Sequence, residues 1–384
     1  MPLTLSYSSG SVASNHNPQS AAGWLGEGWD LSVGSISWSE HNVTSGCSSS
    51  CGNTWENTWQ FSDPFGNGGE LIPPDSNISV WYDDTGQGLH AEPLAWLTDT
   101  NPFVKIGSYT NPNSNPNFPS GTYPTQPPCF RAYLPSGVIE EFGCTTDSLQ
   151  YYVSNGKNFI DQWNLDMVVD PNGNQIHFSY TSLTNTDKSS GVSFPIDTVL
   201  SNITYDSPNC HSTTTMCTGS NWLPQARIVF FTAETATRVT STTCSGGATF
   251  SNTTTYGNAQ TMRCDDVHDL SGSGGLGAPA LQSLFILNAI EVQVATSGSN
   301  STWETLRKYD FSYEQGASNQ NWDDPVTGQL ESIAGYLDLT EIQEVGDDGS
   351  TTMPPLTFTY QGGDEFYLDN EYLPSPTTDC GPSW

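Results

Sequence analysis

The chain has 384 residues, with 41 acidic side chains against 9 lysines and arginines, and a formal net charge of −32. Such a charge argues against nucleic acid and anionic membrane surfaces as partners, because binding either of them needs a dense basic patch. Hydrophobic residues make up only 35% of the chain, while 36 Gly, 25 Pro and 12 Trp favour many short strands joined by turns.

The N-terminus shows no signal peptide, because Met1 leads directly into an alternating strand pattern. The longest purely apolar run, Leu284–Leu287, is far too short to span a membrane. If the protein is secreted, its targeting sequence lies upstream, and we therefore expect the chain to be a fragment of a longer protein.

Apolar side chains recur at every second position along most of the chain, which predicts strands with one buried face. Residues 3–7 form the first such strand. Residues 29–33 alternate in the same way, and a Gly34-Ser35 turn then leads into Ile36 and Trp38. This segment is predicted to be the first hairpin.

A second hairpin is predicted from two cysteines. Cys129 and Cys144 are equidistant in sequence from the dipeptide Ser136-Gly137. A two-residue turn at that dipeptide would place the two cysteines directly opposite each other on paired strands. We therefore predict a cross-strand disulfide.

Residues 164–169 and 175–180 are predicted to form two strands around a type I turn at residues 170–173. On the second strand His177 faces away from its apolar neighbours. We therefore expect this histidine to face solvent rather than to bind a ligand.

The segment Leu281 to Ala295 has enough apolar residues for a helix, but these residues alternate and are largely β-branched, which favours a strand. Residues 303–313 are predicted to form a long strand antiparallel to it. Residues 337–345 and 356–360 are predicted to form a further hairpin around Asp347-Asp348-Gly349.

Three loops are predicted at residues 110–128, 207–221 and 241–277. Short intervals between cysteines suggest that disulfides staple loops of this kind. The candidate pairs are Cys47 with Cys51, Cys210 with Cys217, and Cys244 with Cys264, which leaves Cys380 unpaired. Disulfides persist in oxidising compartments, so an extracellular or cell-surface location is expected. Sequons for N-glycosylation occur at Asn42, Asn77, Asn202, Asn252 and Asn300.

These patterns predict an all-β protein of multi-stranded antiparallel sheets, arranged as a sandwich or an open shell, with long disulfide-stapled loops. Residues 1–363 would form one β-rich region, with a candidate subdomain boundary near residues 181–200. Residues 364–384 lose the alternation and are predicted to be an exit linker.

No residue pattern supports catalysis. The six histidines are isolated, and neither a Gly-x-Ser-x-Gly elbow nor a phosphate-binding loop occurs. Glu140-Glu141 and Asp265-Asp266 would point to opposite faces of a strand, so solvated surface charge is favoured over a catalytic pair. The chain is not expected to be an enzyme, although a carboxylate pair from distant strands stays open as an alternative.

No cofactor is expected. Calcium is the alternative that stays open, because Asp83-Asp84, Asp323-Asp324 and Asp347-Asp348 offer oxygen ligands. None of these pairs has the spacing of a dedicated calcium loop, so turn formation is favoured. The tryptophans are expected to pack between strands rather than to stack on sugars.

The opening Pro2-Leu-Thr-Leu-Ser-Tyr-Ser-Ser9, followed by Gly26-Glu-Gly-Trp-Asp-Leu31 and Gly34-Ser-Ile36, resembles the start of the N-terminal region of Rhs/YD-repeat proteins and of the B component of insecticidal toxin complexes. The stretches that extend this resemblance are 133–142, 163–174 and 337–360, the last with its ending Pro354-Pro-Leu-Thr-Phe-Thr-Tyr360. Together they span residues 2–360, and the form they resemble is the large secreted bacterial type.

The resemblance implies an extracellular β-rich module that precedes a hollow shell of YD repeats around a C-terminal toxic or variable domain. This sequence has no run of Tyr-Asp-x-x-Gly-Arg repeats, no aspartate-type self-cleavage motif and no effector domain. Encapsulation and autoproteolysis therefore cannot be assigned to this chain.

The leading hypothesis is a non-catalytic structural and interaction module that contributes a rigid β-shell wall, plug or attachment surface. Its partners would be the rest of its own polypeptide or neighbouring copies. One alternative is an adhesive or filament-forming subunit that assembles by strand pairing. The other is a carbohydrate-binding or glycoside-hydrolase-like module.

Overall fold

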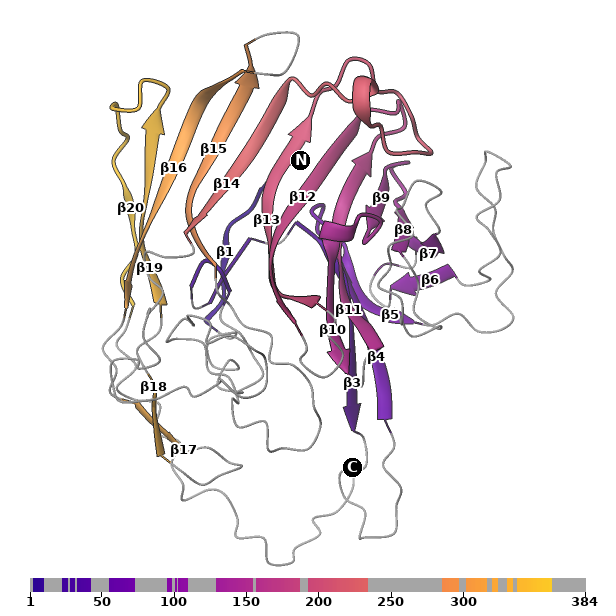
Figure 1. The fold of residues 1–384 in the computed structure, drawn as a ribbon, viewed down its shortest axis with the longest axis horizontal. Helices are drawn as coiled ribbons and strands as arrows, with labels where there is room; N and C mark the ends of the chain where they lie inside the picture. The colour runs from indigo at the N-terminus through magenta and orange to yellow at the C-terminus, as the bar shows by residue number, and fades with distance from the viewer. Residues whose placement is uncertain are drawn as a thin grey trace, which may run out of the picture.

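The computed structural model describes residues 3–9, 23–26, 28–31, 33–42, 55–72, 95–98, 101, 103–109, 129–154, 157–186, 193–233, 285–296, 302–315, 320–323, 330–333 and 337–360. Nearly all of these residues lie in antiparallel strands or in the turns between them (Figure 1). The helical elements named among the described residues are the single 3-10 turns η1 (Thr146–Ser148) and η2 (Gly219–Asn221), and the predicted all-β class is confirmed. Within the described residues no helix is long and apolar enough to cross a membrane.

Eight strands close into a ring. Each pairs with the next in the order β11, β3, β4, β5, β6, β7, β8 and β9, and β9 then pairs with β11 again. The ring strands are β3 (Ser35–Asn42), β4 (Trp55–Ser62), β5 (Gly68–Ile72), β6 (Ala95–Thr98), β7 (Lys105–Tyr109), β8 (Cys129–Tyr133), β9 (Ile139–Phe142) and β11 (Lys157–Val169).

Strand β11 closes the ring because its two halves have different partners. Residues 162–164 pair with β3, whereas residues 165–169 pair with β9. The register shifts between Leu165 and Met167, which leaves Asp166 as the extra residue of a β-bulge. Strand β10 (Leu149–Ser154) pairs with the first half of β11.

The remaining strands of the sheet extend from the other edge of β11 as an open structure, which we call the wing (Figure 1). The wing runs in the order β12, β13, β14, β15, β16, β19 and β20. These strands are β12 (Gln175–Thr186), β13 (Ser193–Tyr205), β14 (Ala226–Ala233), β15 (Ile286–Ala295), β16 (Trp303–Gln315), β19 (Leu337–Gly346) and β20 (Leu356–Thr357).

Two small sheets stand apart from this arrangement, β1 (Ser6–Tyr7) with β2 (Trp29–Asp30) and β17 (Gln320–Asp323) with β18 (Leu330–Ile333). The predicted first hairpin is therefore wrong, because β2 pairs with β1 while β3 pairs with β4 and β11. The chain passes from the β1–β2 sheet to the large sheet at Gly34. This residue has a φ of +113°, and a Cβ there would lie only 2.8 Å from the carbonyl oxygen of Ser62, so both features favour glycine.

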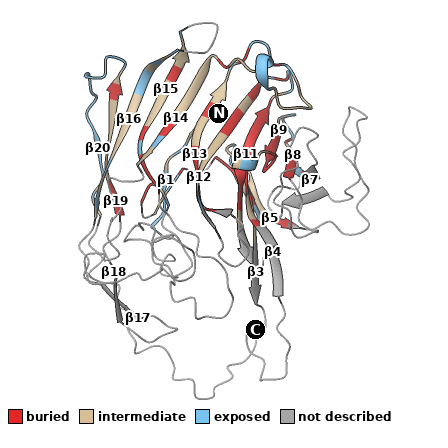
Figure 2. Cartoon of the chain, viewed as in Figure 1, coloured by how far each residue is buried: buried red, intermediate tan, exposed pale blue. Residues whose placement is uncertain are grey.

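The core of the ring is aromatic. Trp59 on β4 contacts Phe130 on β8 and Trp163 on β11, with ring centroids 5.7 and 5.4 Å apart. Phe61 on β4 reaches Phe142 on β9 in the same way, at 5.7 Å. Since β4 does not neighbour β8 or β9 in the sheet, these contacts cross the interior of the ring. Figure 2 shows the buried residues concentrated along β8, β9 and β11.

In the part of the wing that the structure describes, fewer side chains are buried than in the ring. Along β14, β15 and β16 most side chains are only half-buried (Figure 2). Residues 23–31 cover part of one face, where the Trp24 ring lies 5.9 Å from that of Phe230 and the Trp24 carbonyl accepts a hydrogen bond from the Leu287 amide. This segment joins the apolar residues of the wing to the core of the ring.

Several predicted strands are confirmed. These are residues 164–169 and 175–180 within β11 and β12, residues 286–295 of the predicted strand 281–295 as β15, and the antiparallel β16. Residues 281–284 lie outside the described residues. The pairing of β19 with β20 is also confirmed. The turn between β11 and β12 depends on Asp170, whose Oδ1 accepts hydrogen bonds from the amides of Asn172 and Asn174 at 2.8 and 2.9 Å.

The disulfide of the second hairpin forms, but the predicted turn is one residue too short. The amide of Leu134 donates to the carbonyl of Val138, so the loop contains three residues and Phe130 pairs with Phe142. Cys144 would then be one position out of register. The chain leaves the strand at Gly143, where φ is +69°, and this bend brings Cys144 within bonding distance of Cys129.

Some predictions lie outside the described residues. These are the loops 110–128 and 241–277, the linker 364–384, and the cysteines Cys47, Cys51, Cys244, Cys264 and Cys380. The loop 207–221 is described and ordered, and Cys210 is bonded to Cys217 within it. The candidate boundary near residues 181–200 stays a prediction.

Candidate functional site

A row of side chains crosses the outer face of the ring and continues onto the wing. Cross-strand partners share a face of a sheet. Arg131 pairs with Glu141, Glu141 with Met167, and Met167 with His177, so these four side chains lie on the face opposite to the aromatic core. All four are buried. The row is therefore covered, and the covering element is the disulfide-bonded loop at residues 207–222, which we call the capping loop.

Gln175 holds the capping loop through its side-chain amide. The nitrogen donates to the carbonyls of Ser212 and Thr215, both at 2.7 Å, and the oxygen accepts from the amide of Cys217 at 2.9 Å. Three hydrogen bonds from one buried side chain leave little freedom to this part of the loop. The backbone of the turn before β12 also packs closely against the capping loop. A Cβ added at Gly173 would lie only 2.7 Å from the carbonyl carbon of His211.

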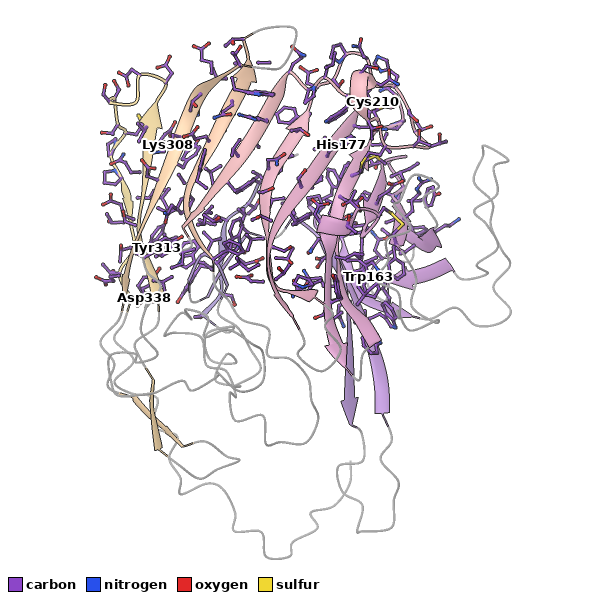
Figure 3. All side chains as sticks on the ribbon, viewed as in Figure 1. Trp163, His177, Cys210, Lys308, Tyr313 and Asp338 are labelled. Carbon is purple, nitrogen blue, oxygen red and sulfur yellow. A yellow bond between two sulfur atoms is a disulfide. The ribbon has the colours of Figure 1, made fainter. Side chains whose placement is uncertain are left out.

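His177 lies under the same loop. Its ring stacks on Trp222 with centroids 3.5 Å apart and planes 13° from parallel, and its Nε2 lies 2.8 Å from the Gln175 side-chain oxygen. Burial lowers its pKa to about 3, so the imidazole is neutral. The prediction that His177 faces solvent is wrong, since this face of β12 is covered by a loop distant in sequence. Figure 3 shows His177 and Cys210 at the same end of the sheet.

Arg131 connects the ring to the capping loop. It forms an ion pair with Glu141, to which Nε donates at 3.1 Å, and its Nη2 donates to the carbonyl of Thr214 at 3.1 Å. Both side chains are almost fully buried, at 3% and 0% exposure. Such a pair is costly to desolvate, but removing one partner would leave an uncompensated charge.

Asp166, the extra residue of the β11 bulge, forms hydrogen bonds with the residues that follow β9. Its Oδ2 accepts hydrogen bonds from the amides of Cys144 and Thr145 and from the hydroxyl of Ser148. The Thr145 and Ser148 distances are 3.0 and 3.1 Å. Burial raises its pKa well above the ordinary value, with the nearby Glu141 adding to the shift and the hydrogen bonds opposing it.

Glu140 points into the ring, in line with Ala132 and Val168 on the neighbouring strands. It is fully buried, and neither carboxyl oxygen has a hydrogen-bond partner within the described residues. Burial, and to a smaller extent Asp63, raise its pKa well above the usual range, which favours the uncharged acid. Glu140 and Glu141 thus face opposite sides as predicted, but the prediction that they are solvated surface charges is wrong.

Asp161 is a second isolated acid. It is the unpaired residue where the register of β10 and β11 shifts. The residue as a whole is half-buried, yet its carboxyl is enclosed, and Oδ1 has no hydrogen-bond partner in the described part of the chain. Burial raises its pKa to about 7.

One group of potential ligand atoms lies close together in the described residues, on Glu141, Cys144 and Asp166, all within 4.8 Å of one another. These residues do not fit a metal ion, because Cys144 is disulfide-bonded and offers no thiolate. The two carboxylates that remain fall far short of the six to eight oxygens that calcium takes. Their complete burial also separates them from any substrate.

The other aspartates considered as calcium ligands either stabilise turns or lie outside the described residues. Asp348 accepts hydrogen bonds from the amides of Ser350 and Thr351 at 2.9 and 2.7 Å, and these bonds lower its pKa. This is the expected turn role. Asp83, Asp84, Asp265, Asp266 and Asp324 lie outside the described residues, and of Asp323 only the backbone is described.

Most described tryptophans pack against protein, as predicted. Trp24, Trp38, Trp59 and Trp163 belong to the apolar core or contact it, and the Trp29 ring packs 4.7 Å from that of Phe358. Trp303 on the wing lies beneath the guanidinium of Arg227, 4.2 Å from ring centroid to Cζ. The sequon residue Asn202 is half-buried on β13 and Asn42 ends β3, while Asn77, Asn252 and Asn300 lie outside the described residues.

Sequence reasoning missed the linked cluster of Arg131, Glu141, Asp166 and Gln175. One signal was available in the sequence, because residues 165–169 are apolar on both faces of the strand and are interrupted only by Asp166. A continuous run of this kind indicates a strand covered on both faces. An acidic residue within such a run is therefore expected to have a buried partner.

No protein-family model matches the chain, and no curated protein matches it. Solved structures do. A crystal structure of TcdB2-TccC3-TEV has a TM-score of 0.50 and 16% sequence identity, and the match covers 94% of this chain and 15% of that one. A mutant Photorhabdus luminescens Tc holotoxin pore has a TM-score of 0.50 and 15% identity over the same shares.

The N-terminal domain of the effector protein SpvB from Salmonella typhimurium also matches, at a TM-score of 0.48 and 13% identity, over 90% of this chain and 94% of that one. The chain spans about 15% of the length of the TcdB2-TccC3 chains that it matches. At these identities the likeness concerns the fold. The fold of this chain is therefore similar to a β-rich part of toxin-complex structures.

Proposed function

We propose that this chain is a non-catalytic structural and interaction module of a bacterial extracellular or cell-surface protein of the Rhs/YD-repeat type. It would supply a rigid β wall, plug or attachment surface to the polypeptide that carries it. Its partners would be the rest of that polypeptide or neighbouring copies of it.

The observation that carries this proposal is the continuity of the sheet. The ring and the wing form one hydrogen-bonded surface that extends from β9 to β20. The fold likeness to TcdB2-TccC3 extends over 94% of the chain, so it concerns this whole arrangement rather than one hairpin. A continuous sheet with one closed end suits a wall, because its strands cannot slide without breaking a whole ladder of hydrogen bonds.

The absence of enzymatic activity is proposed from the position of the acids. Glu140, Glu141 and Asp166 are fully buried, and Arg131 links Glu141 to the capping loop. A catalytic carboxyl must reach its substrate within hydrogen-bond distance. Glu141 and Asp166 instead hold strands and loops together through their hydrogen bonds.

An extracellular location is supported by the disulfides Cys129–Cys144 and Cys210–Cys217. Disulfides of this kind are stable in oxidising compartments. The net charge of −32 would keep such a surface soluble and discourage contact with nucleic acid.

Electron cryo-microscopy of the full polypeptide that carries these residues tests the proposal. We expect the ring and the wing to be present and to contact adjacent segments of that polypeptide or a second copy. A module tethered by a linker without such contacts would contradict the proposal. So would hydrolysis of a glycan, ester or peptide substrate by the 384-residue chain that Asp166→Asn or Glu141→Gln abolishes.

The adhesive alternative depends on strand edges. The wing ends at β20, which is only two residues long, and residues 351–357 are exposed. Short edge strands resist pairing with other chains. This edge therefore favours the wall over a subunit that polymerises by strand pairing.

A further inference from the structure

Two buried carboxyl groups, on Glu141 and Asp166, lie close to each other and to Cys144 of the Cys129–Cys144 disulfide. One oxygen of Glu141 accepts hydrogen bonds from Arg131, and one oxygen of Asp166 accepts them from two amides and a hydroxyl. The other oxygen of each group, Oε2 of Glu141 and Oδ1 of Asp166, is enclosed and has no hydrogen-bond partner within the described residues. The two carboxyl groups approach within 4.8 Å.

The charges of this cluster do not balance. Glu141 and Asp166 are both 0% exposed and Arg131 is 2% exposed. Among the described residues of this cluster, two carboxylates and one guanidinium leave a formal charge of −1 in a buried site. An uncompensated buried charge costs several kcal/mol, and two neighbouring carboxylates repel each other as well.

A proton fits the space between the carboxyls better than a metal ion does. A single proton turns one carboxyl into a donor toward the other, and a side-chain movement that shortens their separation of up to 4.8 Å would give both unpartnered oxygens a hydrogen bond. The proton also makes the cluster neutral. A divalent ion would instead need several further oxygens, which Arg131 and the disulfide-bonded Cys144 do not provide.

We propose that Glu141 and Asp166 share one buried proton, and that this proton locks the bulge of β11 to the end of β9. Since β9 and β11 are the strands that close the ring, the lock stabilises the closure itself. Loss of the proton would leave two neighbouring carboxylates at this junction.

The sign of the pH dependence follows from the extra proton. In the unfolded chain both carboxyls are ionised above about pH 4. The folded chain still holds one proton there, in agreement with the raised pKa of both groups, for which burial is the largest cause. The folding equilibrium constant therefore falls by about tenfold per pH unit above about pH 4, until the pair itself ionises.

Other titratable groups face the pair and must be separated from it. These are Arg131 on β8, Asp147 in η1, and Tyr180 and His177 on β12. Glu140 and Asp161 also have raised pKa values. Glu140 lies on the opposite face of β9 from Glu141, and Asp161 lies in the half of β11 that pairs with β10. A comparison between two chains that differ at Asp166 alone cancels all these contributions.

Asp166→Asn is the decisive variant. The asparagine oxygen can accept the same hydrogen bonds, and its NH2 can donate permanently to Glu141. Urea unfolding of the 384-residue chain is measured between about pH 5 and pH 8 in a Glu140→Gln/Asp161→Asn background, with and without Asp166→Asn. We expect the ratio of the folding constants, parent over variant, to fall about tenfold per pH unit. Equal slopes for the two chains would overturn the proposal.

A second measurement does not need the Asp166 variant to fold. In the same background, with carbon-13 in the side-chain carboxyls of Asp and Glu, infrared spectroscopy at neutral pH distinguishes a protonated carboxyl from a carboxylate. We expect a band from a protonated, solvent-shielded carboxyl that disappears when the pH is raised until the pair ionises. A spectrum at neutral pH with carboxylate bands alone would overturn the proposal.

Discussion

The ring and the wing are built from the same kind of strand but bury their side chains differently. In the ring, Phe130, Phe142 and Trp163 are completely buried, and contacts between strands that are not neighbours fill the interior. In the wing, the strands β14 to β16 carry mostly half-buried side chains, and Leu306 on β16 is 44% exposed.

This difference indicates a division of labour. A closed ring has no free strand edges, and its packed interior resists opening. An open sheet with half-buried faces keeps surface available for other polypeptide segments. We therefore expect the ring to determine the stability of the module and the wing to make its contacts, and matched substitutions in the two parts test this.

The largest difference is expected for tryptophan. Trp163→Ala should lower the free energy of unfolding by about 3 to 5 kcal/mol, because it leaves a cavity between Trp59 and Phe130. Trp303→Ala in the wing removes a partly exposed ring and its contact with Arg227, so we expect a loss of about 1 kcal/mol. Urea unfolding measures both. Equal losses would mean that the ring has no special role in stability.

The ion pairs should differ almost as much. Arg131→Met should cost about 3 kcal/mol, because it leaves Glu141 buried without its counter-charge and frees the carbonyl of Thr214. The matched change Arg307→Met breaks the exposed wing pair with Glu344, whose atoms lie 3.5 Å apart, and should produce no measurable change. Unfolding curves at low and high salt check this, since only the exposed pair is screened by ions.

Two glycines with nearly the same backbone conformation give a smaller contrast. Gly143→Ala should cost about 2 kcal/mol, because its Cβ would lie 2.2 Å from Cδ1 of Trp163. Gly349, in the turn between β19 and β20, has a φ of +66° and open space around it, so Gly349→Ala should cost about 1 kcal/mol. Thermal unfolding of the two variants compares them, and the reverse order would contradict this account of the ring.

A pH dependence is expected at the border between ring and wing. His177 is neutral when folded, with a pKa of about 3, but protonates near pH 6.5 when unfolded. The unfolded state therefore gains the proton first, and the folding constant should fall by up to tenfold per pH unit below about pH 6.5. His177→Phe keeps a ring against Trp222 but cannot titrate. The ratio of wild-type to variant folding constants, from urea unfolding at about pH 4 and pH 7, should fall on acidification, and a constant ratio would contradict the burial of His177.

The sequence predicts strands well because alternation is a local property. The turn at Asp170 and the β-branched run of β15 specify their structures from neighbouring residues alone. The partner of a strand is a different matter. The pattern before Gly34 correctly indicates extended chain, yet β2 pairs with β1, because the close contact of Gly34 with Ser62 belongs to a different part of the fold.

The site was harder to predict for the same reason. Alternation correctly places Glu140 and Glu141 on opposite faces, but it cannot reveal that the ring encloses one and the capping loop covers the other. His177 was misjudged because its covering residue, Trp222, is 45 positions away along the chain. Burial of a polar side chain by a distant loop leaves no local pattern in the sequence.

The closing role of β11 has a consequence for biogenesis. Strands β3 and β9 both find a partner in β11, so a growing chain that has passed residue 142 still has two unpaired edges. Until Lys157–Val169 emerges, these edges are free to join the edges of other nascent chains. We expect truncations that end before β11 to aggregate when expressed, and those that end just beyond β12 to yield the first soluble product.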